Sequence, residues 1–146
     1  MAIAAALLQL YRDTHFEVRL PSRAGRSCLR IGQPLPETVQ AWLGDAPLCA
    51  FITAYNPFSQ AQAAALNRAA QHALLRQLKN LQARWLPAVG RIPGQAWREP
   101  SLLVADLALD RIDALAWHHS QNAVVMAHRQ AAVQLRIYAA DGARTL

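Results

Sequence analysis

The chain has 146 residues, of which 53% are hydrophobic and 16% are charged. This length and composition suit one compact domain with a hydrophobic core, and they exclude an intrinsically disordered chain. No stretch reaches the roughly 18 consecutive apolar residues of a membrane-spanning helix, and the N-terminal residues lack the basic start of a secretory signal. We therefore expect a single cytoplasmic domain over residues 1–146 with no part in a membrane.

The formal net charge is +6, and the basic residues are unevenly distributed. Between Asp45 and Glu99 the sequence has no acidic residue but six basic ones, and 14 of the 15 basic residues of the chain are arginines. Arginine forms paired hydrogen bonds with a carboxylate or a phosphate more readily than lysine does. The charge therefore fits either a solvated surface or a face that binds anions.

The first part of the chain alternates helical and strand-like patterns. Apolar residues at helical spacing come first, and two runs of alternating apolar and polar residues follow, separated by a loop over residues 21–26. The predicted elements are a helix over 3–11, a hairpin of strands over 15–20 and 27–32, a helix over 36–43 and a buried strand over 48–54.

The longest predicted element is a helix from residue 60 to residue 83. Ser59 is positioned to cap it, with Gln62 three residues later as the second half of a capping box. We expect a stripe of leucines to be buried against a sheet and a line of basic residues to face solvent. The leucines are Leu66, Leu74, Leu78 and Leu81, and the basic residues are Arg68, Arg76 and Lys79.

The second half of the chain is predicted to be richer in strands. Its elements are a strand over 85–92 interrupted by Pro87, a strand over 101–107, a helix over 110–119, a hairpin of strands over 123–126 and 133–138, and a tail from Asp141. The whole pattern indicates an α+β (mixed α/β) fold, in which helices pack on a single mixed sheet and hairpins lie near both ends of the chain.

Three clusters of polar residues lie at predicted strand boundaries. They cover residues 53–59, 97–101 and 120–122, and Glu99 is the one carboxylate among them. Polar connectors at strand ends are where such folds usually present ligand-binding groups, so we expect the clusters to meet at one end of the sheet. An ion pair of Glu99 with Arg98, and ordinary caps and turns, are the structural alternatives.

Together with residues 11–14 and 30–32, these clusters resemble the pattern of an uncharacterised bacterial family, domain-of-unknown-function family 3293. The resemblance extends from Tyr11 to about Tyr138. Its most specific part is the run over 51–59, followed by Trp97, residues 99–101 and residues 121–123. The resemblance implies a small stand-alone cytoplasmic protein and assigns it no activity.

The first functional hypothesis is a binding module for a small polar or anionic, nucleotide-like ligand at the strand ends. Amide side chains would orient such a ligand, an indole would stack on it, and a guanidinium would pair with its charge. The residues expected to form this site are Arg30, Asn56, Ser59, Trp97, Glu99, Gln121 and Asn122.

Two alternatives remain open at this point. Glu99 beside Trp97 could act as a general acid or base if burial raises its pKa, which would make the protein an enzyme. The basic helix face formed by Arg68, Arg76 and Lys79 could instead bind nucleic acid or a protein partner without sequence specificity. The histidine and cysteine spacing predicts no metal site, and no motif predicts a cofactor.

Overall fold

The computed structural model describes residues 4–21 and 25–146. Residues 22–24 of the predicted loop over 21–26 therefore lie outside the described residues. The helices are α1 (Ala5–Asp13), α2 (Glu37–Leu43), α3 (Ala64–Asn80) and α4 (Leu109–His118), with a 3₁₀ turn, η2, at Pro57–Ser59. The strands are β1 (His15–Arg19), β2 (Arg26–Leu29), β3 (Leu48–Ile52), β4 (Trp85–Arg91), β5 (Arg98–Val104), β6 (Ala123–His128), β7 (Gln134–Ala139) and β8 (Gly142–Thr145).

All eight strands form one sheet in the order β2-β1-β4-β5-β3-β6-β7-β8. The α+β class, the single sheet and the hairpins near both ends are confirmed, but every neighbouring pair is antiparallel, so the sheet is not mixed. Strands β3 and β4, which are joined through α3, do run in the same direction. They do not pair because β5 lies between them and is antiparallel to both.

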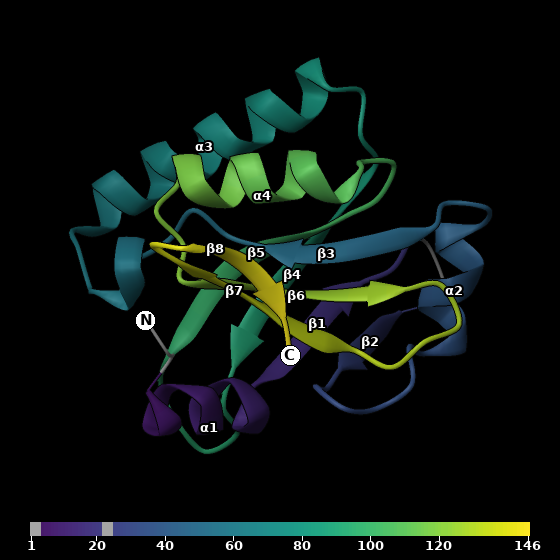
Figure 1. Cartoon of the computed structure of the whole chain (residues 1–146), viewed down its shortest axis with the longest axis horizontal. Helices are drawn as coiled ribbons and strands as arrows, with labels where there is room; N and C mark the ends of the chain where they lie inside the picture. The colour runs from purple at the N-terminus through teal and green to yellow at the C-terminus, as the bar shows by residue number, and fades with distance from the viewer. Residues whose placement is uncertain (1–3, 22–24) are drawn as a thin grey trace.

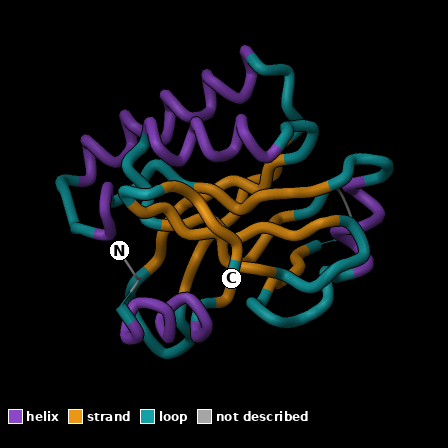
Figure 2. Tube along the Cα trace, viewed as in Figure 1, coloured by secondary structure: helices purple, strands orange, loops and turns teal. Residues whose placement is uncertain are grey.

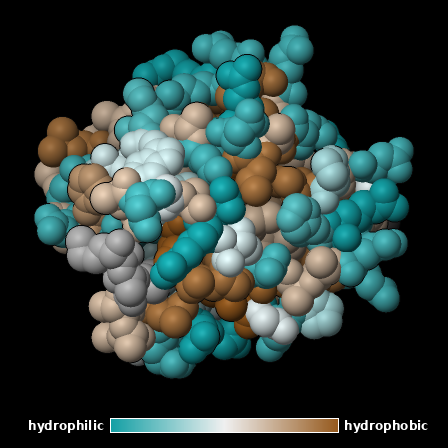
Figure 3. All heavy atoms as spheres, viewed as in Figure 1, coloured by the Kyte–Doolittle hydropathy of each residue, from teal (hydrophilic) through white to brown (hydrophobic). Residues whose placement is uncertain are grey.

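The two faces of the central strands pack against different helices. In β3 every residue is buried, because alternate side chains enter two separate hydrophobic clusters. One cluster lies under α3 and α4, which cover the same face of the sheet, and the other includes side chains of α2 and α1 (Figure 1). In the view of Figure 3 most surface residues are hydrophilic, and hydrophobic ones reach the surface in small separate areas.

The sheet curls so that its two halves meet at one end. The segment after β2 pairs with the segment before β7, where the amide of Gly32 donates to the carbonyl of Val133 at 2.8 Å and the amide of Val133 donates to the carbonyl of Gln33 at 2.9 Å. Helix α2 lies at this end, and its Val39 and Leu43 are completely buried. The curvature is visible in the trace of Figure 2. The paired segments around Gly32 and Val133, together with α2, therefore close the inner face of the sheet at this end.

Helix α3 is shorter than predicted, and the predicted phase of its apolar stripe is wrong in the first turn. The helix begins at Ala64, after an N-cap at Ala63 without a side-chain bond, so Ser59 does not cap it. Leu66 is 60% exposed, whereas Leu74 and Leu78 are fully buried as predicted. The reason is that Asn67 takes the inward position of the first turn, which leaves Leu66 about 100° away around the helix.

The basic residues of α3 lie where the sequence predicts them. Arg68, Arg76 and Lys79 are exposed, and the partly buried Leu81 packs against the cluster under the helix. Among the described residues, none of the helices has the length and hydropathy needed to cross a membrane.

Strand β4 is continuous through Pro87, contrary to the predicted interruption. Pro87 is paired with Leu102 of β5, while the pairing of β4 with β1 ends at Ala88. A proline lacks an amide hydrogen, and here it has a paired strand on one side. Pro87 is therefore tolerated within an inner strand of the sheet.

The predicted tail from Asp141 is also wrong, because residues 142–145 form β8. The strand follows a tight turn in which Ala139 pairs with Gly142, whose φ angle is +125°. The two residues of the turn are Ala140 and Asp141, and Gly142 after them adopts its positive φ without steric cost. The last hairpin of the sheet is therefore β7–β8.

The helix phase leads to a stability test on α3. Leu74→Ala should reduce the free energy of unfolding by about 2–5 kcal/mol, because it empties a fully buried site. Leu66→Ala, on the same helix but exposed, should change it by about 0.5 kcal/mol or less. Urea unfolding monitored by circular dichroism measures both values. Equal losses for the two variants would contradict the observed phase.

Candidate functional site

A pocket of about 400 Å³ opens at one end of the sheet. Its lining comes from the starts of β1, β5 and β6, from the end of β4, and from the segment that follows β3. These boundaries meet because, in an antiparallel sheet, the start of one strand lies beside the end of its neighbour. Helix α1 contributes a further wall. The predicted polar clusters are therefore brought to one place.

Most of the pocket wall is apolar. Phe16 and Phe51 form its base, with their ring centroids 5.1 Å apart in an edge-to-face arrangement. Leu10 of α1 and Trp97 also line the pocket, and they remain 48% and 39% exposed. The pocket thus offers hydrophobic surface both inside and where it opens to solvent.

Gly90 helps to create the space inside the pocket. It pairs with Phe16 on one side and with Glu99 on the other, so the three residues share the inner face of the sheet. A Cβ atom at this position would lie 3.4 Å from Cη2 of Trp97 and 3.7 Å from Cγ2 of Thr14. The missing side chain therefore leaves room in the pocket between Trp97 and Thr14.

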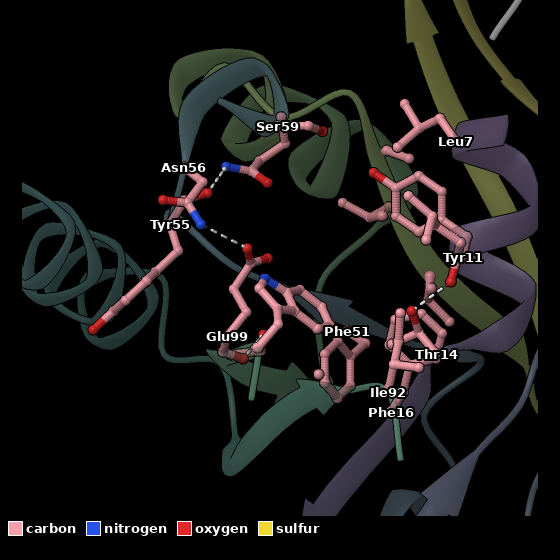
Figure 4. A pocket seen from close by; sticks show the side chains of 18 of the residues that line it. Leu7, Tyr11, Thr14, Phe16, Phe51, Tyr55, Asn56, Ser59, Ile92 and Glu99 are labelled. Atoms are coloured by element: carbon pink, nitrogen blue, oxygen red, sulfur yellow. Dashed lines mark hydrogen bonds between the residues drawn. The ribbon is translucent and has the colours of Figure 1, made fainter. Parts of the chain in front are cut away.

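Glu99 supplies a carboxyl group inside the pocket. Figure 4 shows this side chain pointing into the cavity from β5, across from Tyr11 on α1. Nδ2 of Asn56 donates a hydrogen bond to Oε2 of Glu99 at 3.2 Å. Burial raises the pKa of Glu99 to about 7, and the hydrogen bond from Asn56 acts in the opposite direction. The carboxyl group therefore titrates near neutral pH rather than in the acidic range of an ordinary glutamate.

No cation among the described residues compensates this carboxyl group. Among the described residues, none of those that line the pocket is Lys, Arg or His, and none of the ion pairs includes Glu99. Arg98 is the adjacent residue, but neighbouring side chains of a strand point to opposite faces, and Arg98 lines a separate depression on the outer face. The alternative of an ion pair between Arg98 and Glu99 is therefore wrong.

Asn67 on α3 holds the Asn56 side chain in position. Nδ2 of Asn67 donates to Oδ1 of Asn56 at 2.8 Å, and the backbone amide of Asn56 donates to Oδ1 of Asn67 at 2.9 Å. Nε2 of Gln62 donates to the same Asn67 oxygen at 2.8 Å. Because the Asn56 oxygen is already occupied, its Nδ2 is directed at the carboxyl group. The sequence analysis missed Asn67, although a polar residue in line with buried Leu74 was a signal.

The connector at 56–59 has an unusual backbone. Asn56, Phe58 and Ser59 all have positive φ angles, between 49° and 59°. This region is uncommon for residues other than glycine and is unfavourable for a bulky residue such as phenylalanine. The conformation is held by the Phe58 amide, which donates to the carbonyl of Ser120 at 2.6 Å, and by Nδ2 of Asn122, which donates to Oγ of Ser59 at 2.9 Å.

Gln121 also holds the connector at 56–59 in place, through the residue before it. Its Nε2 donates to the carbonyl of Tyr55 at 3.1 Å and to the carbonyl of His119 at 3.2 Å, and the side chain is buried. Buried side chains whose polar atoms are satisfied rigidify their surroundings. The connector before β6 therefore fixes the connector after β3.

Tyr11 on α1 places a phenol in the pocket that the sequence analysis did not assign to the site. Burial raises the pKa of Tyr11 to about 12; the charge of Glu99 adds to the rise, and Ser59 opposes it. The phenol therefore keeps its proton at neutral pH and serves as a hydrogen-bond donor. The signal in the sequence was an amphipathic helix with its one aromatic residue near its C-terminal end.

The structure brings most of the predicted ligand-binding residues together. Asn56, Ser59, Trp97, Glu99 and Gln121 line the pocket, and Asn122 is bonded to Ser59. Arg30 does not line it. Its guanidinium group instead bonds to Nε2 of His15 at 3.0 Å and to the carbonyl of Arg12 at 3.1 Å. Within residues 4–21 and 25–146, no three His, Cys, Asp or Glu side chains are grouped as metal ligands.

Comparison with known proteins identifies a family but no characterised relative. A model of the family described as "Protein of unknown function (DUF3293)" matches residues 52–124, which is half of the chain. The match contains the connector at 56–59, Asn67, Gly90, Glu99 and Gln121, while the α1 wall precedes it. No curated protein and no solved structure matches the chain.

The raised pKa of Glu99 leads to a test of stability against pH. The folded state holds the Glu99 proton more tightly than the unfolded state, whose pKa is near 4.5. Its contribution to stability is therefore complete below pH 4.5 and is lost as the pH rises through about 7. Between these limits the loss should be on the order of 3 kcal/mol.

The matched variant for this test is Glu99→Gln, which keeps the shape of the side chain and an oxygen that can accept from Asn56. All other titrating groups are common to both proteins. The free energy of unfolding of the wild type minus that of the variant, measured by urea unfolding, should therefore decrease between pH 4.5 and pH 8. A difference that does not change with pH would show that the carboxyl group is not desolvated.

Proposed function

The chain belongs to the DUF3293 family of proteins of unknown function, and we propose that it binds a small, largely apolar molecule that carries a cationic or hydrogen-bond-donating group. A pocket of about 400 Å³ lies within the usual range for small-molecule sites. The apolar walls of the pocket would contact the apolar part of the ligand. The Glu99 carboxyl group would contact its cationic or hydrogen-bond-donating group.

The observation that carries this proposal is the Glu99 carboxyl group without a cation. Desolvating a carboxylate is costly unless a charge or several donors compensate it. In the described chain the Asn56 amide is its one hydrogen-bonding side chain, at 3.2 Å. A ligand amine, amidine or aminated heterocycle would supply the missing charge or donors, and its binding would lower the pKa of Glu99.

The ligand class differs in charge from the one that the sequence alone favours. An anionic, nucleotide-like ligand needs a basic partner, and the described lining holds none, while Glu99 would repel a phosphate. A heterocycle with amino groups keeps the base-like part of the nucleotide-like ligand and leaves out its phosphate. It has N–H donors for the carboxyl group and a flat face that could stack on Trp97.

Acid–base catalysis at Glu99 is a second candidate function. A carboxyl group with a pKa of about 7 can both donate and accept a proton at neutral pH, which is the property required of a general acid or base. The hydroxyl groups of Tyr11 and Ser59 line the same pocket and could orient a substrate. In this case the bound molecule would be turned over.

We place this function in the cytoplasm. Both cysteines, Cys28 and Cys49, are free thiols, and burial raises the pKa of the Cys49 thiol to about 12, which keeps it unreactive. Proteins with unpaired cysteines are typical of reducing compartments. The thiols are structural in this proposal.

The proposal is tested by thermal shift with matched sets of small molecules. Amines, amidines and aminated heterocycles should raise the melting temperature, whereas carboxylates and phosphates of the same size should not, because a ligand that binds the folded state stabilises it. Gly90→Val is the steric control, since its side chain would fill the part of the pocket between Trp97 and Thr14 and should abolish every shift. Stabilisation by anions alone, or shifts that persist in Gly90→Val, would contradict the proposal.

Glu99→Gln separates the two candidate functions once a ligand is found. In a binding site the variant should lower the affinity for cationic molecules and leave neutral apolar ones nearly unaffected. In an enzyme it should abolish turnover of the bound molecule while binding is retained. Equal binding of cationic ligands by wild type and variant would exclude the carboxyl group from either role.

A further inference from the structure

The outer face of the sheet carries a row of basic side chains across four adjacent strands. Helices α3 and α4 cover this face from Leu102 onward in β5 and at Trp85, the first residue of β4. They leave the first residues of β5, the later residues of β4 and strands β1 and β2 uncovered. The guanidinium group of Arg30 bonds to His15, His15 pairs with Arg91 of β4, and Arg91 pairs with Arg98 of β5. Four basic groups therefore lie side by side.

A second basic pair lies on the same face. Arg19 of β1 pairs directly with Arg26 of β2, and Arg19 shares its face with His15 because the two residues are four positions apart on one strand. Arg19, Arg26 and Arg98 line a common depression of about 160 Å³. The row and the pair are therefore parts of one basic surface, which we call the outer basic face.

One carboxylate lies among the paired strand positions of this face. Glu17 accepts a hydrogen bond from Nε of Arg91 at 2.7 Å, and four arginines remain beside that pair. Like charges directly opposite each other on neighbouring strands are destabilising. An external anion would remove the repulsion and would accept hydrogen bonds from the exposed residues Arg19, Arg26 and Arg98.

We propose that the outer basic face binds the phosphate backbone of a nucleic acid without sequence specificity. The row of basic groups crosses three strand spacings, or roughly 14 Å, so it matches an extended polyanion better than a single phosphate. Arginine is the side chain that best contacts phosphate through paired hydrogen bonds. Between the basic residues lie Cys28, Val89 and Pro100, which offer no aromatic ring for base stacking.

This surface is independent of the pocket. Glu99 points to the inner face and Arg98 to the outer face of the same strand. Glu99→Gln should therefore bind nucleic acid as the wild type does. The basic face of α3, formed by Arg68, Arg76 and Lys79, is the competing surface, and it provides a control with the same change in charge.

The experiment measures the fluorescence anisotropy of labelled single- and double-stranded oligonucleotides at increasing salt concentration. The outer-face variant is Arg19→Gln/Arg26→Gln/Arg98→Gln, in three exposed residues whose side chains form no ion pair within the described chain. Its affinity should fall on the order of tenfold or more for every oligonucleotide, and the slope of log K against log salt should become shallower by about 2–3. Arg68→Gln/Arg76→Gln/Lys79→Gln should bind as the wild type does.

Several outcomes would overturn the proposal. The proposal is wrong if the wild type does not bind oligonucleotides at low salt, or if the α3 variant loses as much oligonucleotide affinity as the outer-face variant. It is also wrong if the protein binds heparin or anionic vesicles but not oligonucleotides. Thermal melting followed by circular dichroism establishes that each variant folds. If the triple outer-face variant does not fold, Arg19→Gln and Arg98→Gln are measured singly, and each should flatten the salt slope by about 1. Single variants with the wild-type slope would also overturn it.

Discussion

The position of β5 between β4 and β3 is the constraint on which the rest of the structure depends. The chain makes β3, then α3, then β4, and it places β5 in the gap between the two strands. In the same way β3 lies between β5 and β6, which are joined through α4. Each helical connection therefore spans a strand that is antiparallel to both of its neighbours. As a result, the connectors 53–59, 92–97 and 119–122 all meet at one end of the sheet.

The same arrangement explains why one strand serves two surfaces. The β5 residues alternate between a curled inner face, where the sheet and α1 enclose a pocket, and an outer face that the helices leave partly open. Glu99 on the inner face is desolvated and lacks a cation, whereas Arg98 on the outer face lies in a cluster of arginines. Opposite charges on adjacent residues are thereby kept apart by the sheet. Each side is left with uncompensated charge of one sign, which is the physical basis of both proposals.

The sequence was sufficient for most local features of the fold, although the first turn of α3 and strand β8 were predicted wrongly. Periodicity placed most helices and strands close to their observed bounds, and the polar residues at strand boundaries marked Asn56, Glu99 and Gln121 before any geometry was known. What it lacked was the order of strands, because pairing between distant segments leaves no local pattern. The antiparallel sheet, the place of Arg30 outside the pocket and the row of basic residues all follow from that order.

Two residues of the site show why sequence reasoning was incomplete. Asn67 interrupts an apolar stripe, and its inward orientation becomes clear once the reciprocal bonds with Asn56 are seen. Gly90 matters because of the side chain that it lacks, and its neighbours Phe16 and Glu99 are far from it in sequence. The opposite orientation of Arg98 and Glu99 follows from the two-residue period of a strand. It was missed because the strand was predicted over 101–107, whereas β5 spans Arg98–Val104.

The central claim is that the pocket holds a desolvated carboxyl group without a cation, and carbon-13 NMR of the Glu99 side-chain carboxyl group measures it most directly. Titration of the free protein should show a pKa of about 7 for this group. Asn56→Ala should raise the pKa further, because the hydrogen bond from Asn56 stabilises the ionised form. A pKa of Glu99 near 4.5 in the folded protein would contradict the account.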